Sequence, residues 1–137
     1  VYALGGFIEQ NRNPDPNAFF YDVAADKRTT IAPLPRSRGA AAAIALDGKI
    51  HLIGGAGAPT NERASVGWHE VYDPQADKWE IRKALPAARD HVGAVSGNGR
   101  LVPYTRTALG RVVSRAAYSD VAPNQSSSAY PYARRRD

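Results

Sequence analysis

The sequence predicts an all-β protein assembled from repeated units of antiparallel strands. Short apolar stretches alternate with clusters of Gly, Pro, Asn and Asp, a pattern typical of strands joined by turns. Several landmarks recur in the same order at a spacing of about 50 residues, which indicates stacked or radially arranged repeats. Asp47-Gly48 and Asn98-Gly99 each separate two apolar runs, and such dipeptides are strong hairpin signals.

Each landmark has a physical role in the predicted sheets. Glycine pairs allow a turn at positive φ, where a Cβ atom would clash. An Asp after a strand can hydrogen-bond its own turn. Trp79 supplies a large apolar plate between neighbouring repeats, whereas Arg28 stands at the matching position of the first repeat and leaves it without that plate. The recurring landmarks are Gly5-Gly6 and Gly54-Gly55, Tyr21-Asp22 and Tyr72-Asp73, and Leu34-Pro35 and Leu85-Pro86.

This order of landmarks resembles the kelch family of β-propellers, and the match covers residues 1 to about 100. The resemblance implies a kelch-type β-propeller fragment with four-stranded antiparallel blades. It divides the chain into a partial blade at 1–37, a complete kelch repeat at 38–88 and the start of a third repeat at 89–104. Because a propeller closes with four to eight blades, we expect further blades of the same parent chain to complete it.

The complete repeat should contain strands near 40–46, 49–53, 69–72 and 79–83. The Ala-rich first stretch has helical propensity, but the Asp-Gly turn directly after it favours a hairpin. The partial blade should hold strands near 1–4, 18–23 and 28–32, and the third repeat should begin with a strand after Arg89. Polar loops are expected at 7–17 and 56–67.

The C-terminal stretch 105–137 departs from the repeat. The net charge of +5 lies entirely in residues 98–137, because 1–97 hold equal numbers of basic and acidic residues. Two interpretations stay open. The stretch is an irregular or disordered basic Arg/Ser/Ala-rich tail, or it is out-of-frame sequence after about Gly99, which translation of the other reading frames would reveal.

The candidate ligand-binding residues follow the Leu-Pro pairs. Arg38 and Arg89 occupy matching positions, where the resemblance implies a propeller face near the central channel. They could bind a carboxylate through bidentate bonds, or hydrogen-bond backbone carbonyls between blades, which we favour because a residue repeated in each blade tends to serve the blade. Asp90 and His91 complete a polar cluster with Arg89; His91 could act as an acid, a base or a ligand, or be structural. The three histidines lack metal-ligand spacing, so we expect no metal site.

The function expected from this resemblance is a binding scaffold for a protein or carbohydrate ligand, without a cofactor. The alternative is part of a sugar-acting enzyme, either a galactose oxidase-like oxidase or a sialic-acid epimerase-like isomerase, whose catalytic residues would lie mostly outside this stretch. The sequence has no Cys for a disulfide or thiolate site and no apolar run long enough to span a membrane. Nucleic-acid binding would rest only on the tail arginines and is not expected. A periplasmic or extracellular location is preferred over the cytoplasm.

Overall fold

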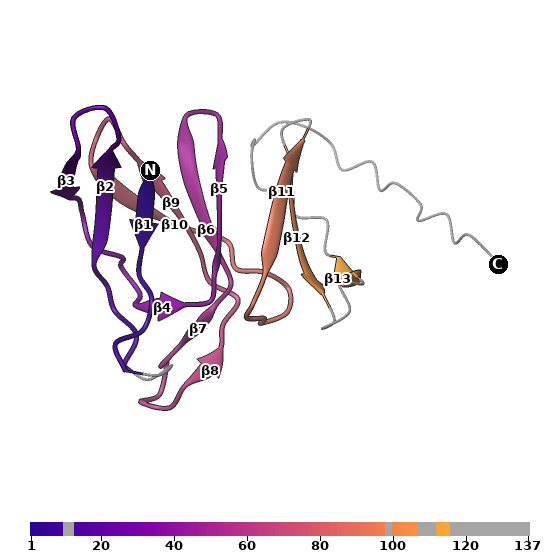
Figure 1. Ribbon diagram of the computed structural model, residues 1–137. Coiled ribbons are helices and arrows are strands. Elements are labelled where there is room, and N and C mark those ends of the chain that lie inside the picture. The colour runs from indigo at the N-terminus through magenta and orange to yellow at the C-terminus, as the bar shows by residue number, and fades with distance from the viewer. Residues whose placement is uncertain (10–12, 98–99, 107–111, 116–137) are drawn as a thin grey trace.

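The structure is a computed structural model that describes residues 1–9, 13–97, 100–106 and 112–115, with the backbone alone for 105–106 and 112–115. These residues form antiparallel strands in four sheets, which confirms the all-β prediction. Three of the sheets stand side by side, and a small fourth sheet lies at one end of their strands (Figure 1). The described residues contain no helix that is long and apolar enough to cross a membrane.

The second sheet is the complete repeat, and its four strands lie close to the predicted ranges. They are β5 (Ala42–Leu46), β6 (Lys49–Ile53), β9 (His69–Asp73) and β10 (Lys78–Arg82), in the spatial order β10-β9-β6-β5. Asp47 and Gly48 both adopt positive φ, at 50° and 75°. These φ angles are those of a tight hairpin turn between twisted strands. The turn explains why the Ala-rich stretch before it forms a strand rather than a helix.

The first sheet repeats the outer part of the second. It contains β1 (Tyr2–Leu4), β2 (Ala18–Asp22) and β3 (Lys27–Thr30), in the order β1-β2-β3. Tyr21 pairs with Arg28 just as Tyr72 pairs with Trp79. The register therefore agrees with the sequence alignment, in which Arg28 replaces the tryptophan of the next repeat.

The third sheet consists of β11 (Gly93–Gly97), β12 (Arg100–Arg106) and β13 (Val112–Arg115), in the order β11-β12-β13. The strand β13 falls within the stretch 105–137 that was predicted as a tail, and it pairs with the end of β12. Residues 107–111 and 116–137 lie outside the described part of the chain, and with them most of that predicted tail.

The small sheet was not predicted from the sequence. Its strands β4 (Arg38–Gly39), β7 (Ala56–Gly57) and β8 (Ala64–Ser65) have only two residues each, in the order β4-β7-β8. Two of these strands come from the stretch expected to be a polar loop. A strand of two residues shows no period, so its existence depends on tertiary pairing rather than on local pattern.

Apolar side chains fill both spaces between the three large sheets. Ala18, Leu34 and Leu52 form a buried cluster between the first and second sheets. Ile53, Leu85 and Leu101 form the corresponding cluster between the second and third sheets. Neighbouring residues of a strand point to opposite faces, so β6 places Leu52 in one cluster and Ile53 in the other. The central strand β6 is thus buried on both faces.

Candidate binding face

The double glycines position the linkers at the end of the sheets where the small sheet lies. Gly6 donates its N–H to the carbonyl of Arg38 at 3.0 Å, and Gly55 donates to the carbonyl of Arg89 at 2.9 Å. Gly54 adopts φ 65°, and a Cβ atom there would lie 2.8 Å from the Arg89 carbonyl oxygen. Both repeats therefore tie the strand end to the linker that follows Leu-Pro, which requires glycine at this position.

Arg38 is buried inside its own repeat. Its side chain is fully buried, forms an ion pair with Glu70, and donates a hydrogen bond from Nη2 to the Leu52 carbonyl at 2.9 Å. Burial lowers the pKa of the Arg38 guanidinium, while the negative charge of Glu70 acts in the opposite direction. Of the two roles considered from the sequence, the structure shows Arg38 bonded to a backbone carbonyl, but within one repeat rather than between two.

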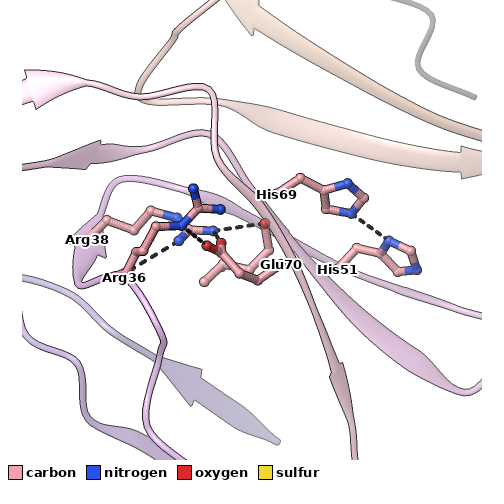
Figure 2. Close-up of polar contacts among 6 residues, drawn as sticks. Arg36, Arg38, His51, His69 and Glu70 are labelled. Carbon is pink, nitrogen blue, oxygen red and sulfur yellow. Dashed lines mark hydrogen bonds and ion pairs between the residues drawn. The ribbon is translucent and has the colours of Figure 1, made fainter. Parts of the chain in front are cut away.

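A second arginine joins this buried charge cluster. Arg36 Nε also forms an ion pair with Glu70, as Figure 2 shows. The guanidinium carbon of Arg36 lies 4.8 Å from the centre of the Trp68 ring, and that of Arg38 lies 5.7 Å from it. Two cations thus share one carboxylate and one aromatic ring, a combination that offsets the cost of burying charge. Arg36 remains 27% exposed and so reaches solvent at this end of the sheets.

Asp90 contacts its neighbour His91 and Arg63 of the preceding loop, and Arg63 in turn contacts Phe7. Asp90 Oδ2 lies 3.5 Å from Arg63 Nη2, and Asp90 Oδ1 lies 3.3 Å from His91 Nδ1. The Arg63 guanidinium carbon stands 5.5 Å from the centre of the Phe7 ring. We call this group the loop-face patch; it consists of Phe7, Arg63, Asp90 and His91. Its members remain accessible, with the side chains of Arg63 and His91 exposed to 41% and 73%.

Arg89 is half-buried, whereas Arg38 at the matching position is buried. Sequence reasoning found Asp90 and His91 but missed Phe7, Arg36, Arg63 and Trp68. The loop residues among these have no distinguishing pattern. Glu70, in contrast, had a usable signal: an acidic residue inside the otherwise strand-like stretch from His69 to Tyr72 marks a buried charge that needs a partner.

The remaining landmarks hold the first and second sheets together. Asp22 and Asp73 each accept hydrogen bonds from the backbone of their own turns, as predicted. Trp79 Nε1 donates to the Ala32 carbonyl at 2.8 Å, and Asp77 Oδ1 accepts the Ala32 N–H at 2.8 Å. The β9–β10 hairpin of one repeat therefore binds both backbone groups of a single residue from the preceding repeat. We call this contact the Ala32 clamp.

Tyr72 completes the clamp and was identified from the sequence, whereas Asp77 was not. Tyr72 Oη donates to Asp77 Oδ1 at 2.7 Å, and the same contact joins Tyr21 to Asp26 in the first sheet. Burial, assisted by this hydrogen bond, raises the pKa of Tyr72. The hydrogen bond from the Ala32 backbone, followed by that from Tyr72, lowers the pKa of Asp77. Within the described residues, no three His, Cys, Asp or Glu side chains gather as a metal site would require.

Proteins with similar sequences carry kelch repeats. A putative F-box/kelch-repeat protein of Arabidopsis thaliana is 32% identical over 80 residues, which are 58% of this chain and 20% of that protein. Kelch-like protein 35 of Mus musculus is 31% identical over 96 residues, which are 70% of this chain and 16% of the mouse protein. The chain thus spans a fifth or less of the length of these curated relatives. No protein-family model matches it.

Solved structures also resemble this fold. The structure of YjhT superposes with a TM-score of 0.62 at 18% identity, over 74% of this chain and 32% of the YjhT chain. At such low identity the likeness concerns the fold alone.

Proposed function

The chain is a stretch of kelch repeats with the fold of a β-propeller segment, and from this premise we propose that it is a scaffold whose loop-face patch binds a protein partner. The observation that carries the proposal is the convergence of Phe7, Arg63, Asp90 and His91 from three separate segments. These segments are held by the hydrogen bonds of the double glycines and by the small sheet. Loops placed on a rigid scaffold are the usual carriers of binding in such folds.

The chemistry of the patch suits a polypeptide surface. It combines an aromatic ring, a cation and an anion within a few ångströms, and Arg36 stands partly exposed beside Trp68 at the same end. Aromatic residues and arginine are the side chains most enriched at protein interfaces. The patch carries both signs of charge, so it favours a partner with mixed charge rather than a uniformly acidic polymer.

The relatives support a scaffolding role. Their names join kelch repeats to an F-box, or, in a protein of Danio rerio, to a BTB domain. In such proteins the kelch region is one module among others. We extend only this modular arrangement to the present chain: a kelch region that contributes a binding surface.

A carbohydrate is the second candidate ligand, because Phe7 offers an aromatic ring next to polar side chains that could orient hydroxyl groups. The oxidase and epimerase alternatives would require this sugar to bind first. They depend on catalytic groups from other blades in addition to Asp90 and His91.

The test compares the full chain with two variants. In Arg63→Ala/His91→Ala the patch loses its cation and its imidazole; in the control Arg28→Ala another exposed arginine is removed, from strand β3. Each protein is immobilised, and bound proteins and arrayed glycans are quantified. We expect to find ligands that bind the unmodified chain and the control variant with equal affinity. Their affinity for the patch variant should be at least 10-fold lower, as expected when hot-spot contacts are lost. Equal binding by all three would place the ligand elsewhere, and selective glycan binding would favour the second candidate.

A further inference from the structure

Two histidines form a buried pair in the second sheet. His51 Nδ1 lies 2.9 Å from His69 Nε2, and the ring centres are 5.1 Å apart with planes inclined by 28°. His51 is 6% exposed and His69 is fully buried. Figure 2 shows the pair on the opposite side of β9 from Glu70 and its arginines.

The pair faces the third sheet. His69 is directly opposite Ile53 in the strand pairing, and His51 is two residues before Ile53 on β6. Residues with these relations lie on the same face of a sheet. Ile53 packs against Leu101 of β12 and against Leu85 of the linker. The histidines therefore belong to the interface between the second and third sheets.

The repeat itself does not require histidine at either position. Counted from the landmarks, Tyr2 stands three residues before its double glycine as His51 does, and Ala18 stands three residues before Tyr21 as His69 does before Tyr72. The first repeat thus fills these places with groups that keep one charge state between pH 5 and 8. The histidines are an addition specific to this interface.

We propose that the His51–His69 pair makes the interface between the second and third sheets sensitive to acid. In the neutral pair one imidazole donates its N–H and the other accepts it. A single added proton can be shared along this bond, but it places a charge in a buried site. A second proton removes the acceptor and sets two like charges side by side. The repulsion between the two charges falls only if at least one histidine moves into water. That movement takes the histidine away from the buried interface where Ile53 packs against Leu101.

Charged neighbours act in both directions on an imidazolium at His51. Arg82 and Lys49 oppose its charge, and Asp47 favours it. Lys49 is paired with Asp73, and Arg82 with Glu80. On the third sheet, Leu101 and Pro103 share the buried side of β12, and neither carries a charge. Burial is the largest cause that lowers the pKa of His51, followed by Arg82.

The direction of the effect follows from this shift. The pKa of His51 in the closed interface is below its ordinary value of 6.5. The closed state therefore binds fewer protons than the opened state, and closure is complete above pH 6.5 and weakens as the pH falls below it. The opening equilibrium should increase by up to about 10-fold per pH unit for each proton taken up.

The test is an NMR titration of the full chain from pH 7.5 to 5. It follows the histidine Cε1–H signals together with the methyl signals of Leu85 and Leu101 at this interface and of Leu34 and Leu52 at the first–second interface. We expect the first methyl pair to shift with the same midpoint as the Cε1–H signal of His51, below 6.5, while the second pair does not follow.

Variants distinguish an effect of the His51–His69 pair from a general loss of stability in acid. In His51→Gln the coupled methyl shift should be lost or at least 10-fold weaker, and His51→Tyr, which copies Tyr2, serves if the glutamine variant does not fold. His91→Gln, at the exposed histidine, should retain the coupled methyl shift with its midpoint. The proposal is overturned if all four leucines shift together, if none shifts, or if His91→Gln removes the effect.

Discussion

At the scale of single residues, the repeat places Ala40 and His91 at matching positions, and both adopt positive φ, at 54° and 48°. The left-handed region costs a residue with a Cβ atom about 1–2 kcal/mol. Ala40→Gly removes this strain but enlarges the entropy of the unfolded chain, so we expect a change between zero and about +1 kcal/mol in unfolding free energy.

The matched control is Ala43→Gly, an exposed alanine in β5, where glycine should cost about 0.5–1 kcal/mol. Urea unfolding of both variants measures whether each substitution raises or lowers the free energy of unfolding. A loss of stability from Ala40→Gly equal to that from Ala43→Gly would contradict the strained backbone at Ala40.

At the scale of elements, the Ala32 clamp makes Trp79 the principal contact of the β9–β10 hairpin with the preceding repeat. Trp79 packs beside the Ala18, Leu34 and Leu52 cluster and donates to the Ala32 carbonyl. Trp79→Ala should therefore cost about 3–5 kcal/mol. Trp79→Phe keeps a ring and loses the N–H donor, which should cost about 1 kcal/mol in addition to any repacking. Denaturant unfolding that showed equal costs for both variants would mean that the ring contributes little to packing.

The elements were largely predictable from sequence because their causes are local. Asp47-Gly48 determines one hairpin through its own φ angles, and the apolar run before Gly54 matches a strand buried on both faces. The small sheet was not predictable in this way, since Arg38–Gly39 pairs with Ala56–Gly57 across the intervening strands. The same holds for the contacts of Arg63 with Asp90 and of His51 with His69. These contacts depend on register and linker path, which residue patterns alone do not reveal.

At the scale of the whole molecule, the groups whose pKa values are shifted by folding define the pH range in which the protein is most stable. Asp77 and Asp73 have lowered pKa values, from the Ala32 backbone hydrogen bond and from Lys49 respectively. Their contribution is present above the ordinary carboxyl value of 3.8 and is lost as the pH falls through the folded pKa values. Tyr72 has a raised pKa, so its contribution is present below its ordinary value of 10.0 and is lost as the pH rises above it.

Thermal midpoints measured from pH 3 to 11 should therefore form a plateau that declines on both sides, with the first acid step below 6.5 from His51 and a second near the carboxyl range. Tyr72→Phe should lower the plateau, because Asp77 loses a donor, and should flatten the alkaline decline. Asp77→Asn should flatten the second acid step. If Tyr72→Phe lowered the plateau but left the alkaline decline unchanged, another group would be responsible for it, and the Tyr72–Asp77 contact would act only through packing.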